Sequence, residues 1–210
     1  MSLRERTRRA VRAELIDAAM RLFLSQGFEV TTVEEIAQAA GISRRSYFRY
    51  FASKDEVFAG ALASIGQAIG HTLAKRPLSE SPWDALRRAF DPLLDQAGTD
   101  PNAEALGRLM LERPSLQQGK HTAWQTEIAT ALETRLPADA TGDRSLSAQA
   151  LAAAAIACLH TAQAQWLAPD EHRELATLLD MSMDAVHPSP SRRGTLGTRE
   201  PGTVGDGSVR

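Results

Sequence analysis

The sequence lacks most of what an enzyme active site or a disulfide scaffold needs. Its 210 residues include one cysteine, so no disulfide can form within the chain, and Cys158 lies in a helical pattern where we expect a small buried side chain. The five histidines are scattered, and the sequence shows no metal-ligand pair, nucleophile motif or phosphate-binding loop. We therefore expect no enzyme, no catalytic residue, no metal and no cofactor.

Long apolar runs and strand patterns are also missing. No stretch approaches the ~20 consecutive apolar residues of a membrane span. The arginine-rich N-terminus has no apolar segment behind it and does not resemble a secretory signal. These absences predict a cytoplasmic protein with no membrane partner. No segment alternates apolar and polar residues as a half-buried strand does, so we expect an all-α fold.

Positive charge is concentrated in the first quarter of the chain. Residues 1–54 contain ten Lys or Arg and six Asp or Glu, a net charge of +4, whereas the remaining residues carry a net charge of −6. A basic end on an acidic body suggests that a polyanion meets only the N-terminal end. A charged face that is merely solvated is the alternative that charge alone leaves open.

Apolar periodicity and capping residues predict about nine helices. The expected helices cover residues 5–25, 32–40, 43–50, 53–73, 81–97, 100–112, 115–135, 145–167 and 169–186. Thr32 with Glu35 and Ser53 with Glu56 read as capping boxes. From Pro188 onward the composition is too polar to order itself. We expect a helix-turn-helix domain over 1–53, a ligand-binding and dimerisation bundle over 54–187, and a flexible tail over 188–210.

Residues 32–50 have the form of a helix-turn-helix unit, in which the second helix enters the DNA major groove. Arg44, Arg45 and Ser46 occupy the first turn of that second helix, and Arg49 follows one turn after Arg45. An arginine can donate two hydrogen bonds to guanine, and such a pair discriminates by about 1–3 kcal/mol. Tyr47 is expected to pack behind the helix.

Two aromatic residues and three polar residues complete the predicted DNA-binding surface. The pattern leaves open whether Phe48 and Tyr50 contact DNA or pack in the core. Thr31 and Thr32, at the start of the unit, and Lys54, in the first turn of the next helix, are placed to meet phosphates.

The runs FEVTTVEEIA (28–37), AGIS (40–43) and YFRYFASKDE (47–56) resemble the DNA-binding domain of TetR-family transcriptional regulators. The resemblance covers about residues 10–58. It implies a homodimer built on the last two helices and a ligand-binding C-terminal body. It also implies that the residues in contact with DNA are Thr31, Thr32, Arg44, Arg45, Ser46, Phe48, Arg49, Tyr50 and Lys54. The operator sequence cannot be copied from relatives, because Arg45 and Tyr47 stand where the family often has a small residue and Leu.

A second resemblance lies in the C-terminal body. The run RLMLERPSL (108–116), Trp124 and the segment 165–167 are similar to the C-terminal domain of mycofactocin-type TetR regulators. By family analogy an effector site lies among the middle helices, and it would take a small apolar or amphipathic molecule. The candidate wall residues, which would equally suit an ordinary core, are Trp83, Phe90, Leu94, Leu106, Met110, Trp124 and Ile128.

Together these features predict a dimeric, ligand-responsive transcriptional regulator on a pseudo-palindromic double-stranded DNA operator. Repression relieved by the small molecule is the expected mode. An activator of the same family and a helical protein-interaction module are the alternatives. The alanine-rich helix over 145–167 and the last helix predict the dimer interface, because small side chains let helices approach closely. A buried helix in a monomer would show the same composition.

Overall fold

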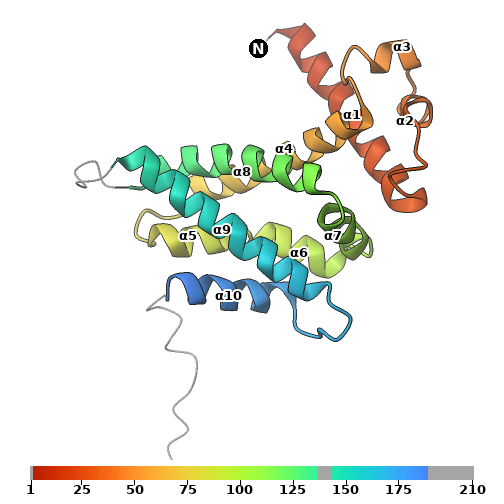
Figure 1. Cartoon of the computed structure of the whole chain (residues 1–210). Coiled ribbons are helices and arrows are strands. Elements are labelled where there is room, and N and C mark those ends of the chain that lie inside the picture. The colour runs from red at the N-terminus through yellow and green to blue at the C-terminus, as the bar shows by residue number, and fades with distance from the viewer. Residues whose placement is uncertain (1, 137–142, 189–210) are drawn as a thin grey trace, which may run out of the picture.

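The computed structural model describes residues 2–136 and 143–188, and every regular element in those two ranges is a helix (Figure 1). The predicted all-α fold is therefore confirmed. From residue 189 on, the predicted tail lies outside the described residues. The helices are α1 (Leu3–Gln26), α2 (Val33–Ala39), α3 (Arg44–Tyr47), α4 (Lys54–Ala74), α5 (Pro82–Ala89), α6 (Asp91–Thr99), α7 (Ala103–Leu111), α8 (Pro114–Glu133), α9 (Arg144–Trp166) and α10 (Leu175–Val186).

Three helix boundaries differ from the sequence prediction. The helix expected over 81–97 is divided into α5 and α6, because Pro92 has no N–H to donate to the preceding turn and its ring crowds that turn. The helix α3 ends at Tyr47, and the chain reaches Tyr50 through tight turns. The helix α10 begins at Leu175 rather than near Pro169, because the Glu171 carboxylate accepts the backbone N–H groups that follow it.

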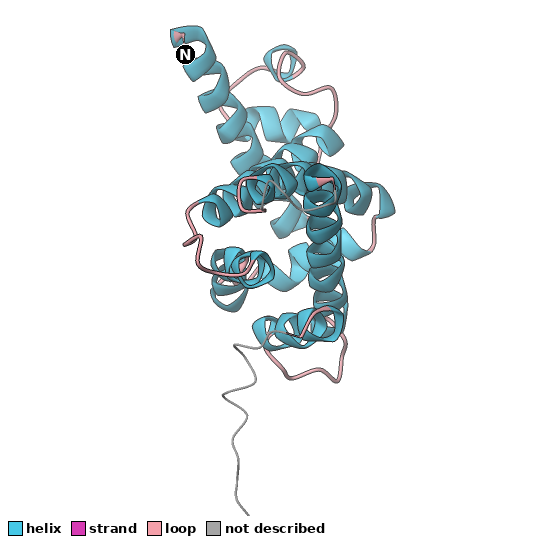
Figure 2. Cartoon of the chain, turned by 90° about the vertical axis from the view of Figure 1, so that its left-hand side faces the viewer, coloured by secondary structure: helices cyan, strands magenta, loops and turns pink. Residues whose placement is uncertain are grey.

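The described helices bury two apolar cores. The first gathers α1, α2, α3 and the start of α4, with Leu15, Phe23 and Ile36 among its members. The second gathers α4 to α6 and α8 to α10, with Trp124 and Leu159 at its centre. Figures 1 and 2 show the first group of helices at one end of the molecule and the bundle at the other.

One helix belongs to both cores. The N-terminal half of α4 contributes Phe58 and Leu62 to the first core, and its C-terminal half contributes Ile69 and Leu73 to the second. In the bundle α4 packs along α8, α8 along α9, and α9 along α10. A domain boundary at residues 53 and 54 stays a prediction, because α4 is continuous through both cores.

Two helices, α4 and α9, are long and apolar enough to cross a membrane by length and composition alone. The sequence expectation that no segment approaches such a length was therefore too strict. Both are core helices, because α4 buries Leu62 and Leu73, and α9 buries Ala152, Ile156 and Leu159. The core helix of a soluble protein passes the same test, so the finding does not indicate a membrane protein.

Candidate functional site

The helix-turn-helix unit is built from local hydrogen bonds that the sequence specifies. The Thr32 Oγ1 accepts the Glu35 N–H at 3.2 Å, and the Thr32 N–H donates to the Glu35 carboxylate at 2.7 Å. This capping box begins α2. Gly41 has a φ of 68°, a left-handed conformation that reverses the chain. The Ser43 hydroxyl then accepts the Ser46 N–H at 3.1 Å and begins α3.

The inner face of α3 is anchored by aromatic packing, as predicted. The Tyr47 and Phe51 side chains are fully buried, and the Tyr47 hydroxyl donates to the Ser53 carbonyl at 2.9 Å. Burial raises the pKa of Tyr47 well above its ordinary value. The Arg12 guanidinium lies 4.1 Å over the Phe51 ring and donates to the Tyr50 carbonyl at 2.6 Å, so α1 fixes the segment that follows α3.

The outer face of α3 carries the predicted base-reading residues. Arg44 pairs with Glu34 at 2.7 Å, and both side chains are exposed. Arg45 and Arg49 are exposed, and their side chains form no hydrogen bond or ion pair with any residue in the described ranges. Phe48 is 47% exposed and lies edge-on to Tyr47, so it belongs to this outer face. Ser46 is partly exposed beside its Ser43 partner.

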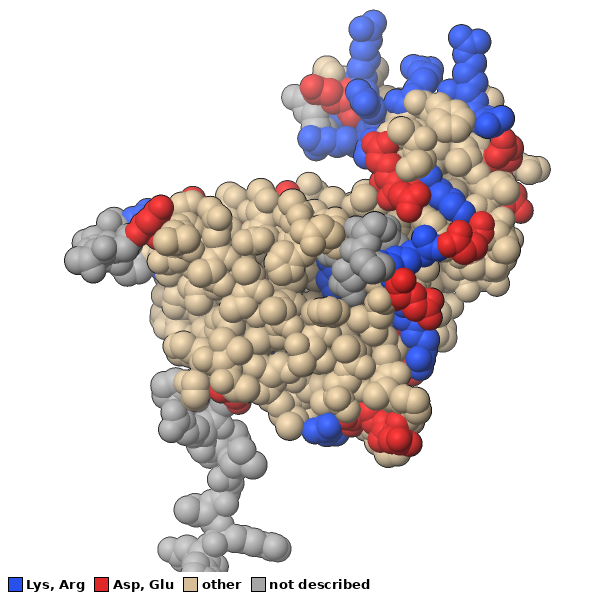
Figure 3. All heavy atoms as spheres, in the orientation of Figure 1, with Lys and Arg blue, Asp and Glu red and all other residues tan. Residues whose placement is uncertain are grey.

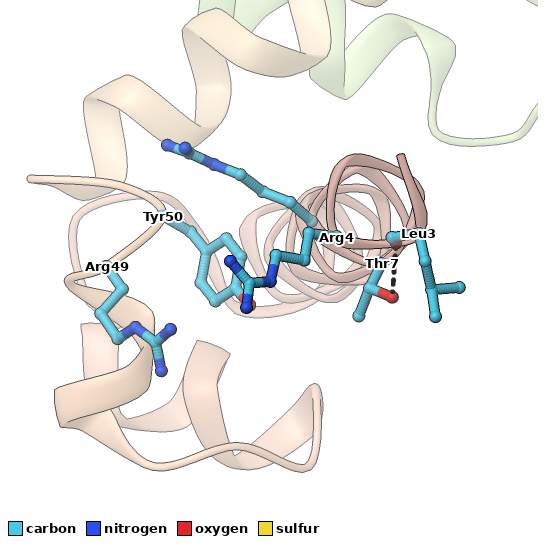
Figure 4. A pocket seen from close by; sticks show the side chains of 6 residues that line it. Leu3, Arg4, Thr7, Arg49 and Tyr50 are labelled. Atoms are coloured by element: carbon cyan, nitrogen blue, oxygen red, sulfur yellow. Dashed lines mark hydrogen bonds between the residues drawn. The ribbon is translucent and has the colours of Figure 1, made fainter. Parts of the chain in front are cut away.

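Beside this face lies a hollow of about 720 Å³ between α1 and the turn after α3. Figure 4 shows that Arg4 and Thr7 come from α1, whereas Arg49 and Tyr50 come from that turn. Tyr50 is partly buried against the first core and also forms part of the wall. None of the described side chains that line the hollow is acidic, and Lys and Arg side chains stand out at this end of the molecule in Figure 3.

Sequence reasoning missed the contribution of α1 to this surface. Arg4 and Arg8 lie one turn apart on α1, and both line the hollow opposite Arg49. The signal was present, because Arg4, Arg8 and Arg12 recur at a spacing of four residues and must share a helix face.

Two of the predicted phosphate contacts do not fit the geometry. Thr31 is 1% exposed, and its hydroxyl donates to the Gly27 carbonyl at 2.7 Å. The Lys54 ammonium donates to three backbone carbonyls, those of Phe28 at 2.6 Å, Glu29 at 2.9 Å and Thr31 at 3.2 Å. An ammonium has three donors, so none is left for a phosphate. Both side chains hold the turn between α1 and α2, whereas Thr32 remains exposed.

The same turn receives a residue from the bundle. Arg113, at the start of α8, forms an ion pair with Glu29. Its guanidinium lies 4.3 Å from the centre of the Phe28 ring, and the Lys54 Nζ lies 4.6 Å from the same ring. Met110 of α7 packs within the first core. The junction of α7 and α8 therefore touches the helix-turn-helix end directly.

A small cavity of about 80 Å³ lies inside the bundle, where α4 and α6 to α10 meet. Its lining residues are Ile65, Leu93, Gln96, Ala97, Asp100, Ala103, Leu106, Gly107, Met110, Trp124, Gln163, Trp166 and Leu175. Three of the predicted wall residues, Leu106, Met110 and Trp124, are among them.

The other four predicted wall residues, Trp83, Phe90, Leu94 and Ile128, are not on this wall. They are buried in the second core. Their helical spacing could not distinguish core from cavity, because both environments select the same apolar side chains. Leu93 and Trp166 are wall residues that the prediction left out.

A hydrogen bond and close helix packing hold the Trp124 side chain in place. Its indole N–H donates to the Leu62 carbonyl of α4 at 2.6 Å in the buried interior. A Cβ on Gly66 would lie 2.6 Å from the Trp124 ring, so only glycine allows α4 and α8 to approach this closely. Next to it, Lys120 is 1% exposed, and its Nζ donates to Gln163 Oε1 at 2.8 Å.

An exposed apolar surface lies on the outside of α9 and α10. Met181 is 52% exposed and Val186 is 59% exposed, although both belong to an apolar helix. A hollow of about 610 Å³ runs between the two helices and is lined by small residues of α9 such as Ala154 and Ala157. Within the described residues, no cluster of three or more His, Cys, Asp or Glu could hold a metal ion.

Comparison with known proteins identifies both parts of the chain. Residues 15–61 match the family model described as "Bacterial regulatory proteins, tetR family", and residues 80–189 match the MftR C-terminal domain. The regulator MftR of Mycobacterium tuberculosis, named for mycofactocin biosynthesis, is 30% identical over 81% of this chain and 86% of its own. The HTH-type transcriptional regulator TcmR of Streptomyces glaucescens is 45% identical, but the match spans only 44% of this chain and 41% of TcmR.

Solved structures agree with this assignment. The TetR-family repressor FadR of Thermus thermophilus, in complex with lauroyl-CoA, is 25% identical with a TM-score of 0.52, over 92% of this chain and all of FadR. SmeT, the repressor of a multidrug efflux pump of Stenotrophomonas maltophilia, has a TM-score of 0.54 at 24% identity, over 83% of this chain and 89% of its own. The second likeness concerns the fold alone.

Proposed function

Because the chain belongs to the TetR family of bacterial transcriptional regulators, we propose that it is a dimeric repressor that binds a pseudo-palindromic DNA operator and releases it when a small molecule enters the bundle. The observation that carries the proposal is the outer face of the helix-turn-helix unit. There the side chains of Arg45 and Arg49 have no partner within the described ranges, and Arg49 lines a hollow with no acidic side chain among its described lining residues.

The DNA-contacting residues fall into two groups. Arg44, Arg45, Ser46, Phe48 and Arg49 lie on or beside α3, where they would meet base edges in the major groove. Arginines donate to guanine, and the exposed Phe48 ring suits a thymine methyl group.

The second group would hold the backbone. Arg4 and Arg8 of α1 flank the hollow, and the exposed Thr32 begins α2, so these three side chains would lie beside phosphates. Tyr50 would contact the sugar-phosphate edge with the exposed part of its ring. Thr31 and Lys54 are not assigned to this group, because their side-chain polar atoms form hydrogen bonds within the protein.

The proposed dimer uses α9 and α10. Exposed Met181 and Val186 lie beside a hollow whose α9 wall is made of alanines, so a second copy of the two helices can approach closely and bury this surface. A two-fold axis through this face would present two copies of α3 to the operator, which is what a pseudo-palindromic site requires.

The proposed effector site is the cavity at Trp124. At about 80 Å³ it is smaller than the roughly 300–1,000 Å³ of ordinary ligand pockets, so a ligand must displace wall residues to bind. Met110 is on this wall and also packs within the first core, and α4 runs through both cores. The lauroyl-CoA complex of FadR, whose fold is similar, supports a ligand-binding role for this chain. The protein would act in the cytoplasm, with no cofactor.

The test is fluorescence anisotropy of the purified dimer on labelled duplex from the upstream region of its own gene, with a scrambled duplex as control. We expect the upstream duplex to bind at least a thousandfold more tightly than the scrambled one at physiological salt. Equal affinity for the two duplexes would contradict the proposal. Run-off transcription from the same duplex then separates repression from activation.

A further inference from the structure

Lys120 is a buried cation that has no acidic partner among the described residues. It is 1% exposed, its Nζ donates to Gln163 Oε1 at 2.8 Å, and the same Nζ lies 4.7 Å from the centre of the Trp124 ring. No Asp or Glu of the described ranges forms an ion pair with it, so a neutral amide and an aromatic face are all that replace the water around the ammonium. Burial lowers the pKa of Lys120 to about 8, which still leaves most of it charged at neutral pH.

A buried lysine of this kind is unusual, because charged side chains are almost never fully buried unless they are paired. An ordinary core position would favour Met or Leu here. One of the ammonium's three donors has a hydrogen-bond acceptor among the described residues, and the other two remain for another acceptor.

The surroundings of Lys120 favour an anion as that acceptor. Both of its partners, Gln163 and Trp124, are on the wall of the bundle cavity. One acidic residue, Asp100, is also on that wall, and its carboxylate accepts the backbone and side-chain N–H groups of Asn102.

On its other side Lys120 lines a groove of about 310 Å³ between α8 and α9. The groove is lined by Gln118, Lys120, His121, Ile156, Ala157 and His160, with no acidic side chain among them. Burial lowers the pKa of His160, and the positive charges of Lys120 and His121 lower it further. The lowered pKa keeps His160 neutral, so the positive charge at this place comes from Lys120 on α8.

We propose that the effector is an amphipathic organic anion whose carboxylate or phosphate head pairs with the Lys120 ammonium beside Gln163, while its apolar body occupies the Trp124 cavity. The inference rests on the proposed function and specifies the chemical class of its effector. An anion at this position would satisfy the two remaining donors of the ammonium. The pair is shielded from water, so the attraction is stronger than between surface charges.

The experiment compares ten-carbon probes that differ only in the head group: decanoate, decyl phosphate, decanol and decylamine, each well below its micelle concentration. Binding to the full-length dimer is measured by tryptophan fluorescence and by the shift in unfolding temperature. We expect decanoate or decyl phosphate to bind at least tenfold more tightly than decanol, and decylamine to bind most weakly. The better of the two anions identifies the head group.

Two variants make the test specific. Lys120→Met removes the cation and keeps the length of the side chain, and Gln163→Glu supplies a permanent carboxylate at the amide position. Each is expected to lower the affinity for the preferred anion at least tenfold and to leave decanol within a factor of two. Lys75→Met removes the same charge from an exposed site directly after α4 and should change none of these affinities.

Three outcomes would overturn the inference: equal affinity for anion and alcohol, an anion preference that survives both variants, or no binding of either anion at millimolar concentration. Operator binding is measured separately on the same preparations. A protein that binds its operator but shows no anion preference refutes only the effector class. A folded dimer that does not bind the operator refutes the regulator proposal whatever the probes show.

Discussion

Replacing Lys54 tests whether this residue stabilises the fold or contacts the DNA backbone. We consider Lys54→Met, which keeps the side-chain length and removes the ammonium. Three carbonyls, those of Phe28, Glu29 and Thr31, then lose a charged donor. Hydrogen bonds to charged groups contribute about 1.5–3 kcal/mol each, and three bonds from one group are far from additive. The contact with the Phe28 ring adds about 0.5–1 kcal/mol at such a partly exposed site.

One effect of removing the ammonium stabilises the variant. Lys54 is the first residue of α4, where a positive charge is unfavourable by about 0.3–1 kcal/mol. The net loss of stability is expected to be roughly 2–4 kcal/mol by these magnitudes. For a chain of this length each kcal/mol lowers the unfolding temperature by about 2–4 °C, so the variant should unfold roughly 5–15 °C earlier. Thermal unfolding followed by circular dichroism measures this shift.

The salt dependence of operator affinity distinguishes the two roles. If each Lys54 of a dimer neutralised one phosphate, the slope of log K against log[salt] would become less steep by about 1.8 in Lys54→Met. The structure predicts no change in slope at a temperature where the variant is folded. Lys75→Met is the matched control for charge, and Arg8→Ala is the variant whose slope should become less steep. A less steep slope in Lys54→Met with an unchanged unfolding temperature would refute the reasoning.

Four further predictions follow from other contacts. Arg45→Ala should reduce the preference for operator over scrambled duplex by about 1–3 kcal/mol, measured by competition anisotropy. Met181→Lys should convert the proposed dimer to a monomer in sedimentation velocity, because it would place a positive charge from each copy in the proposed α9–α10 interface. Trp124→Phe removes the buried indole hydrogen bond to the Leu62 carbonyl and should cost about 0.5–1.5 kcal/mol in denaturant unfolding. Lys120→Met should stabilise the ligand-free protein by roughly 3 kcal/mol at pH 7, since the pKa falls from 10.5 to about 8 on folding. Between pH 8 and 10.5 the unfolded state binds more protons than the folded state, so the stability of the wild type rises with pH. The difference in unfolding free energy between Lys120→Met and wild type should therefore vanish by about pH 10.5, as measured by urea unfolding.

The helices were predictable where the signal is local. The box between Thr32 and Glu35 and the cap at Ser43 lie within three residues, so the sequence alone places them. The division of the helix over 81–97 was also visible, because Pro92 stands in its interior. The end of α3 at Tyr47 was not, since no proline or glycine marks it.

The site was less predictable because its contacts join distant parts of the chain. Lys54 reaches carbonyls 23 to 26 residues away, and only the fold brings them within reach of its ammonium. Arg113 meets Phe28 across an even longer separation. Periodicity could not decide whether Phe48 lies in the core or on the surface, because the answer depends on where α3 ends. Lys120 gave no sequence signal, because a lysine on a helix is ordinarily exposed.

The small size of the cavity has a consequence for regulation. A ligand shifts an equilibrium only by the difference between its affinities for the two states. Moving a population from 1:99 to 99:1 needs about 5.5 kcal/mol of such a difference. An apolar chain of nine carbons contributes about 7 kcal/mol at ~0.8 kcal/mol per buried CH₂. At about 80 Å³ the cavity is too small for such a chain, so under the proposed function most of the binding free energy would favour a state in which the cavity is wider. Met110 lines the cavity and also packs within the helix-turn-helix core, so under the proposed function we expect widening of the cavity to repack that core.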